Sequence, residues 1–128
     1  MARAKMGSSA GWHGNYVESA TASFSLAPGD SGKVFILKDA AVTVTLPSLS
    51  DIDAGYKVKL IAGDGSNHAI AGGASKIYGQ VGDFAGANWE RINAASGYTL
   101  TNGEIGDWLE LISDGTNWYI SGMTDNGA

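Results

Sequence analysis

Short segments in which apolar and polar residues alternate constrain the fold of this chain more than any other feature of its sequence. In the clearest one, residues 42–46 read Val-Thr-Val-Thr-Leu, and Pro47 follows directly. Alternation with period two places successive side chains on opposite faces of a β-strand, and proline cannot donate a backbone hydrogen bond to a sheet. We therefore predict a half-buried strand that ends before Pro47.

Similar segments recur along most of the chain and are separated by turn-forming residues. The 19 glycines among 128 residues are about twice the average share, which suits many short strands joined by tight turns. The sequence predicts an all-β, single-domain β-sandwich or jelly-roll-like barrel of about eight to ten short antiparallel strands. Besides 42–46, the strand candidates are residues 21–26, 33–38, 56–62, 68–71, 75–78, 98–101, 107–112 and 117–121.

The N-terminal segment falls outside this pattern. Residues 1–20 are small and polar, show no period, and contain Trp12, His13 and Tyr16. One interpretation is a disordered tail. The other is an extended arm whose aromatic side chains bind a neighbouring subunit, because Trp and Tyr are typical anchors of interfaces.

The remaining residues, 21–128, are predicted to form the β-domain. Within it, residues 79–97 are the least regular part, with Phe84, Trp89 and Ile92 among Gly, Ala and Asn. We expect an irregular insertion there, and Trp89 is a candidate for surface recognition.

The C-terminal part contains the strongest hairpin signal. Residues 107–112 and 117–121 are rich in β-forming residues and are joined by a turn that contains Asp-Gly. Alternation puts Trp108 and Ile112 on the face opposite the two leucines of the first run. Both faces therefore carry apolar groups. The face with Trp108 and Ile112 is either covered by loops or meets another subunit, and we predict that these two residues pack between protomers.

Charge and composition exclude several classes of protein. The net charge is −5 and the sequence pI about 4.7, which argues against nucleic acid or an anionic membrane as a partner. The longest apolar run, residues 34–37, is far shorter than the roughly 20 residues of a spanning helix. The absence of cysteine excludes disulfides, cysteine-based zinc sites and thiol catalysis.

The histidines and turn aspartates give little sign of metal chemistry. His13 and His68 are not spaced as metal ligands; we interpret His68 as a surface or packed side chain and His13 as a hydrogen-bonding residue of an interface. Asp64 lies in an Asp-Gly-Ser-Asn sequence that lacks the closing glutamate of a calcium loop, so turn chemistry explains it better. We expect no metal and no cofactor.

Paired carboxylates capable of glycoside hydrolysis are the remaining catalytic possibility. The candidates Glu90, Glu104, Asp107 and Glu110 form no recognisable motif, and neither a nucleophile elbow nor a phosphate loop is present. The sequence therefore predicts no catalytic residues.

Three pieces of the sequence together resemble a known β-module. They are Val-Thr-Val-Thr-Leu-Pro at 42–47, the strands and turn at 56–78, and the hairpin at 108–120 with Leu-Ile-Ser-Asp-Gly-Thr-Asn-Trp-Tyr. The module is common in structural proteins of tailed bacteriophages, especially tail fibres, spikes and capsid-decorating proteins. The resemblance spans about residues 23–121 and leaves out the expected arm and insertion.

The resemblance implies a non-enzymatic virion protein that is all-β and homotrimeric. Because the module fills nearly the whole chain, a capsid decoration or cement protein is the leading hypothesis, located on the head surface with the major capsid protein as its partner. Its role would be to stabilise the lattice, with the segment around Trp12 as an anchor. The alternative is a tail-fibre, tail-tip or head-fibre module that binds a host receptor or glycan.

Overall fold

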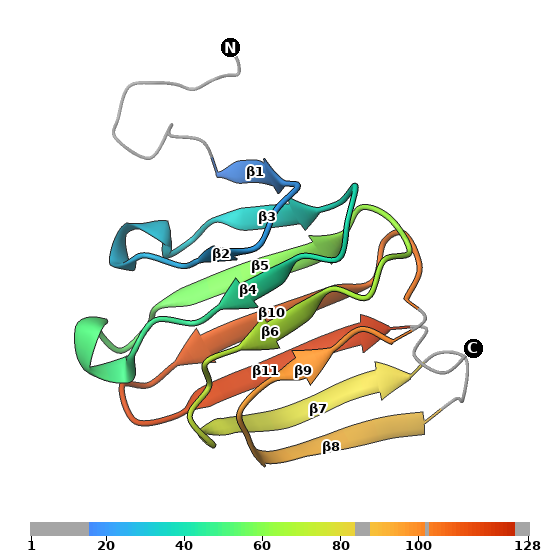
Figure 1. The fold of residues 1–128 in the computed structure, drawn as a ribbon. Coiled ribbons are helices and arrows are strands. Elements are labelled where there is room, and N and C mark those ends of the chain that lie inside the picture. The colour runs from blue at the N-terminus through green and yellow to red at the C-terminus, as the bar shows by residue number, and fades with distance from the viewer. Residues whose placement is uncertain (1–15, 84–87, 102, 125–128) are drawn as a thin grey trace.

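The structure is a computed structural model that describes residues 16–83, 88–101 and 103–124. These residues form two β-sheets packed face to face (Figure 1). Only two 3-10 turns, at Pro28–Asp30 and Leu49–Asp51, interrupt the strands and loops of the described part. The predicted all-β sandwich is therefore confirmed.

The larger sheet has seven strands in the order β1, β3, β5, β10, β11, β7, β8, and the smaller sheet has four in the order β2, β4, β6, β9. The strands of the larger sheet are β1 (Val17–Ala20), β3 (Val34–Leu37), β5 (Lys57–Ala62), β10 (Trp108–Ser113), β11 (Trp118–Thr124), β7 (Ile77–Asp83) and β8 (Asn88–Ala95). Those of the smaller sheet are β2 (Phe24–Ser25), β4 (Thr43–Thr45), β6 (Ala69–Ala71) and β9 (Tyr98–Thr99).

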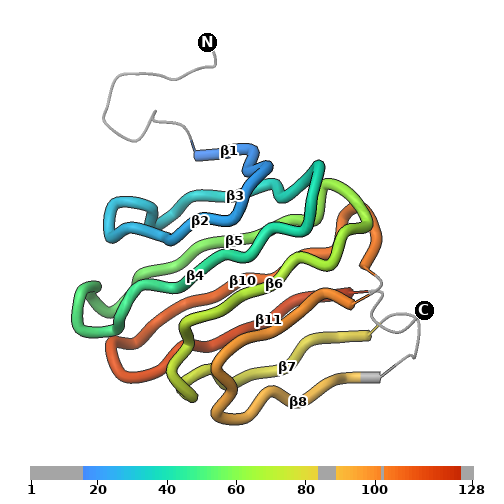
Figure 2. The backbone as a smooth tube through the Cα atoms, viewed as in Figure 1, coloured from blue at the N-terminus to red at the C-terminus, as the bar shows by residue number. Residues whose placement is uncertain are grey.

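The pairing of the strands is mixed, which corrects the expectation of an antiparallel fold. β10 pairs antiparallel with β11 and β5, as do β7 with β8 and β6 with β9. The pairs β1–β3, β3–β5, β2–β4, β4–β6 and β11–β7 are parallel. The physical reason is that from β1 to β7 the chain crosses between the two sheets after every strand, as the tube in Figure 2 shows. Successive strands of one sheet then run in the same direction.

The core lies between the sheets and takes every second side chain from most strands. In β11 the alternation is complete, with Trp118, Ile120 and Thr124 buried and their neighbours exposed. The ring of Trp118 meets Tyr56 edge-on, with 5.8 Å between the ring centroids. The predicted hairpin at the C-terminal end is confirmed as β10 and β11.

The expectation of an irregular insertion at residues 79–97 is wrong. Most of this range belongs to β7 and β8, which form an antiparallel pair with a register shift between Ile77 and Gly79. Residues 84–87 lie outside the described residues. β8 reads Asn-Trp-Glu-Arg-Ile-Asn-Ala-Ala and lies at the edge of the sheet. An edge strand with exposure on both faces needs no regular alternation.

The expected boundary at residue 20 also needs correction. Residues 17–20 form β1, which pairs in parallel with β3 and is part of the larger sheet. Just before it, the carbonyl of Tyr16 accepts a hydrogen bond of 2.6 Å from the backbone N–H of Val34. The β-domain therefore starts by Tyr16, and residues 1–15 lie outside the described part of the chain.

Candidate functional site

The side of the larger sheet that faces away from the smaller sheet carries a row of large apolar side chains. We call this side the outer face. Residues directly opposite each other on paired strands point to the same side of a sheet. The strand registers therefore place one series of residues on the outer face along a line from β3 to β8: Ile36, Ile61, Trp108, Met123, Gly82 and Trp89. We call Ile36, Ile61, Trp108, Met123 and Trp89 the apolar row.

The glycine within this row explains how two of its members meet. A Cβ atom at Gly82 would lie 2.7 Å from the sulfur of Met123 and 3.3 Å from a ring carbon of Trp89. The two side chains therefore cover the glycine from both neighbouring strands, as aromatic residues often do over strand glycines. Trp89 remains 65% exposed, which leaves most of its ring available to a partner.

Trp108 and Ile112 also lie on the outer face, as the alternation in the sequence predicts. Trp108 is half-buried, and the ammonium of Lys59 lies 4.8 Å from its ring centroid. Ile112 is 44% exposed and lies beside Tyr119 in the strand register. The structure thus brings Trp89, Trp108 and Ile112 to one surface, and the packing of Trp108 and Ile112 between protomers stays a prediction.

Sequence reasoning missed two further exposed members of this surface, Tyr119 and Met123. Tyr119 is 41% exposed and Met123 37% exposed. Both alternate with the buried residues of β11. Tyr119 already lies within the predicted strand 117–121, where alternation places it opposite the buried side chains, and extending that strand to residue 124 would have added Met123 on the same side.

The outer face also carries a different charge from the chain as a whole. The registers place Lys57, Lys59 and Arg91 on it, against the single carboxylate of Glu110. A net positive face on a chain of net charge −5 is suited to an acidic partner. The outward side of the smaller sheet differs, because it presents small residues such as Thr43, Thr45, Ala69, Ala71 and Thr99.

The predicted arm is only partly visible. Tyr16 is described, is 45% exposed and precedes the edge strand β1. Trp12 and His13 lie outside the described residues, so their anchoring role stays a prediction.

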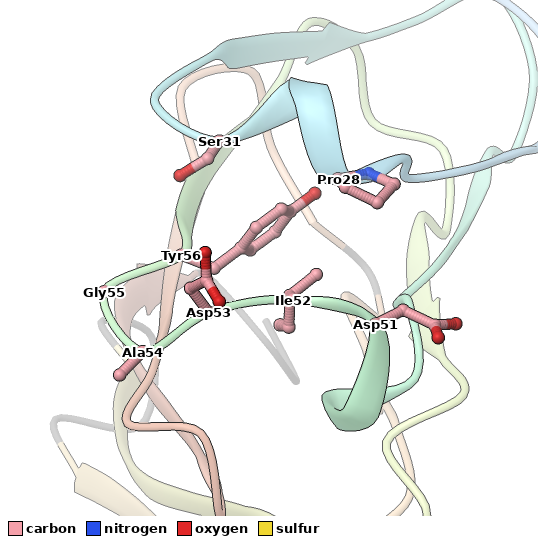
Figure 3. Close-up of a pocket in the computed structure, with 8 residues that line it drawn as sticks. All are labelled: Pro28, Ser31, Asp51, Ile52, Asp53, Ala54, Gly55 and Tyr56. Atoms are coloured by element: carbon pink, nitrogen blue, oxygen red, sulfur yellow. The ribbon is translucent and has the colours of Figure 1, made fainter.

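A shallow hollow of about 270 Å³ lies between the first 3-10 turn and the loop that leads into β5 (Figure 3). The hydroxyl of Tyr56 donates a 2.7 Å hydrogen bond to the carbonyl of Ala27, and burial raises the pKa of Tyr56 to about 12. The carboxylates of Asp51 and Asp53 belong to the loop at its rim. Because the hydroxyl already bonds the backbone, Tyr56 ties the loop to the turn.

The carboxylates considered for glycoside hydrolysis do not form one constellation. Glu90 accepts a 3.0 Å hydrogen bond from the hydroxyl of Tyr98 and is in register with Val81, whose side chain faces the core. Glu110 is on the outer face. The carboxylate of Asp107 accepts a hydrogen bond from the backbone N–H of Glu104, which is turn chemistry.

His68 and the turn aspartates have structural partners. His68 is fully buried, and its ring contacts Asp64 and the backbone of Val42. Backbone N–H groups lower the pKa values of Asp64 and Asp114, chiefly those of Ser66 and Asn117. Within residues 16–83, 88–101 and 103–124, no group of three or more His, Cys, Asp or Glu residues could hold a metal ion.

None of the described segments forms a helix of the length and apolarity required to span a bilayer. No model of a known protein family matches the chain, and no curated protein sequence matches it significantly.

Proposed function

We propose that this protein is a non-enzymatic structural protein of a tailed-phage virion, which decorates the head surface as a homotrimer and binds the major capsid protein. The resemblance of its strand and hairpin sequences to phage β-modules suggests the setting. The observation that carries the proposal is the apolar row on the outer face, because a sheet surface of this kind is suited to a protein partner.

The size and composition of the outer face support a protein–protein contact. The apolar row spans six strands, and five spacings of about 4.8 Å give it an extent of roughly 24 Å. That extent is comparable to the width of a standard interface, which buries about 800 Å² on each partner. Trp89, Trp108 and Tyr119 are residue types that dominate interface energies.

The charges around the row define the partner further. Lys59 and Arg91 lie in the neighbouring row of the outer face and Lys57 one row further, so cations border the apolar side chains along one side, as polar residues do at the rim of an interface. The proposed contact on the capsid is therefore an acidic surface with an apolar centre. Binding should weaken as salt rises, since rim charges act mainly through screened attraction.

The test compares two double variants that differ only in the face they alter. Ile112→Glu with Trp89→Glu places two carboxylates on the outer face. Thr43→Glu with Thr45→Glu places two on the outward side of the smaller sheet and is the matched control. Circular dichroism first verifies that both variants are folded.

Each protein is then mixed with capsid shells of the phage that carries its gene, and the bound copies per shell are counted after sedimentation. We expect regular, high occupancy for the unaltered chain and the control, and at least tenfold weaker binding for the outer-face variant. Absence of binding by the unaltered chain would overturn the proposal, and equal loss in both variants would overturn the assignment of the outer face.

A second candidate function is favoured by one observation. Trp89 is 65% exposed on the edge strand β8, and exposed aromatic rings can stack against sugars. A receptor-binding module would bind defined glycans on an array and lose that binding in Trp89→Ala. A decoration protein would give no reproducible glycan signal.

A further inference from the structure

A hollow of about 550 Å³ opens at one end of the outer face, beside the apolar row. Ile105, Trp108 and Met123 supply apolar walls, and Glu104 and Asp107 supply carboxylates. Ile105 is 74% exposed, more than any other large hydrophobic residue that the structure describes. An apolar hollow with carboxylates at its rim is suited to an apolar side chain from a positively charged segment. We call it the terminal hollow.

The surroundings of the terminal hollow are acidic as well. β5 and β11 run antiparallel to β10, so both end on the side of the sheet where β10 begins. β3 is parallel to β5 and β7 is parallel to β11, so these two strands end there as well. We call this side of the sandwich the acidic end. Lys38, which directly follows β3, carries a positive charge at this end. The adjoining strand ends and loops carry five carboxylates: Asp39, Asp64, Asp83, Glu104 and Asp107.

One segment of this chain has the complementary chemistry. Residues 1–15 contain Arg3, Lys5 and Trp12 and no carboxylate, whereas the rest of the chain has six basic and thirteen acidic residues. We propose that Trp12 of a second copy of this chain occupies the terminal hollow, with residues 1–15 of that copy bound along the acidic end. The contact holds copies together by exchange of N-terminal segments.

The occupant is a second copy because of the reach of the chain. Tyr16 precedes β1, which starts at the end of the sheet opposite the terminal hollow. Four residues extend at most about 14 Å, so this limits the distance between the Cα atoms of Trp12 and Tyr16. The hollow lies roughly 20 Å from Tyr16, three strand spacings across and about four residues along the sheet. The indole ring adds to this reach, so Trp12 of the same copy meets the hollow only if residues 12–16 are fully extended and the ring points straight at it, whereas Trp12 of a second copy needs no such conformation.

The chemistry of the hollow matches an indole ring. Trp108 offers an aromatic surface for edge or offset contact, and the thioether of Met123 is a favourable neighbour for aromatic rings. Trp residues buried in such sites are typical hot spots, whose truncation weakens an interface about 30-fold or more. We expect a loss of that size in self-association when Trp12 is replaced by alanine.

The absence of cysteine makes a direct test possible in the full-length chain. Ala10→Cys places a thiol near Trp12 while retaining the ring, and Ile105→Cys places one at the terminal hollow. Tyr119→Cys is the matched control, because it is exposed on the same face but at the opposite end of β11. Pairs of single variants are mixed and oxidised, and interchain disulfides are identified by mass spectrometry.

We expect Ala10→Cys to cross-link with Ile105→Cys at least tenfold more than with Tyr119→Cys. Equal cross-linking to both positions, or none to Ile105→Cys, would overturn the proposal. A chain that carries both Ala10→Cys and Ile105→Cys tests the reach argument, and a disulfide within single chains at high dilution would show that the segment binds its own copy.

Sedimentation velocity provides the second measurement. Trp12→Ala should dissociate the assembly, whereas Trp89→Ala, which removes an exposed indole from the outer face, should leave it intact. The opposite pattern would contradict the assignment of Trp12 to the hollow. The proposal needs no capsid partner, so failure of shell binding and failure of segment exchange are separate outcomes.

Discussion

The imidazole Nε2 of His68 lies 2.9 Å from Oδ1 of Asp64, and the Nδ1 of the same ring accepts the backbone N–H of Val42 at 3.1 Å. Because Nδ1 is an acceptor, the neutral ring carries its proton on Nε2 and donates it to the carboxylate. Asp64 also accepts from the backbone N–H groups of Asp39 and Ser66, at 2.6 and 3.0 Å. The pair therefore joins two loops at the acidic end.

Replacing His68 by alanine should destabilise the fold strongly. The substitution leaves a cavity and an unpaired backbone N–H at Val42, both buried. The expected loss in free energy of unfolding is about 3 kcal/mol, measured by urea denaturation. Thr43→Ala, on the outward side of the smaller sheet, should lose less than about 1 kcal/mol. Similar losses for the two variants would show that His68 is not a structural link.

The lowered pKa of Asp64 predicts a loss of stability in acid. The backbone N–H of Ser66 lowers this pKa first, followed by that of Asp39. A depressed folded-state pKa contributes stability that is present above the unfolded value of about 3.9 and is lost as pH falls through the folded value. Urea denaturation between pH 6 and the acid limit should show a shallower decline for Asp64→Asn. Parallel declines would contradict this role.

β7 and β11 approach so closely at Gly79 that no side chain fits there. Its φ is +147°, and a Cβ atom there would lie 2.0 Å from the carbonyl oxygen of Ile120. The two backbones cannot separate without loss of their pairing, so Gly79→Ala should cost about 4 kcal/mol or prevent folding. Gly29→Ala is the control, because no atom lies within 4 Å of its Cβ position. Thermal denaturation of both proteins checks the difference.

The raised pKa of Tyr56 predicts that the fold loses stability at alkaline pH. Burial raises its pKa to about 12, so stability present below the unfolded value of about 10 is lost as pH rises through 12. Tyr56→Phe removes this titration and the hydrogen bond to Ala27, at a cost of about 1 kcal/mol at neutral pH. Absorbance at alkaline pH should show one late-titrating tyrosine fewer in Tyr56→Phe. An unchanged titration curve would contradict the assignment.

The sequence was sufficient to predict the strands whose one face is buried. The alternation in 42–46 and 107–112 became β4 and β10 because burial between two sheets imposes period two. The same pattern also placed Trp108 and Ile112 on one face. Alternation indicates which side of a strand is buried. It does not indicate which strand lies beside it, so the parallel pairs could not be predicted from the sequence.

The candidate surface was only partly predictable for the same reason. Trp89 joins Trp108 and Met123 through the register across Gly82, a contact between strands distant in sequence. The edge strand that carries Trp89 lacks alternation because it is largely exposed. Neither the neighbours of Trp89 nor the terminal hollow beside Ile105 has a signal in the local sequence.

The place of β11 between β10 and β7 has a consequence for biosynthesis. β11 emerges from the ribosome after every other described strand, yet it is the one that joins β1, β3, β5 and β10 to β7 and β8. A nascent chain that lacks it holds two separate half-sheets with exposed edges, a state prone to aggregation. Translation must therefore pass residue 124 before the nascent protein gains its cooperative stability.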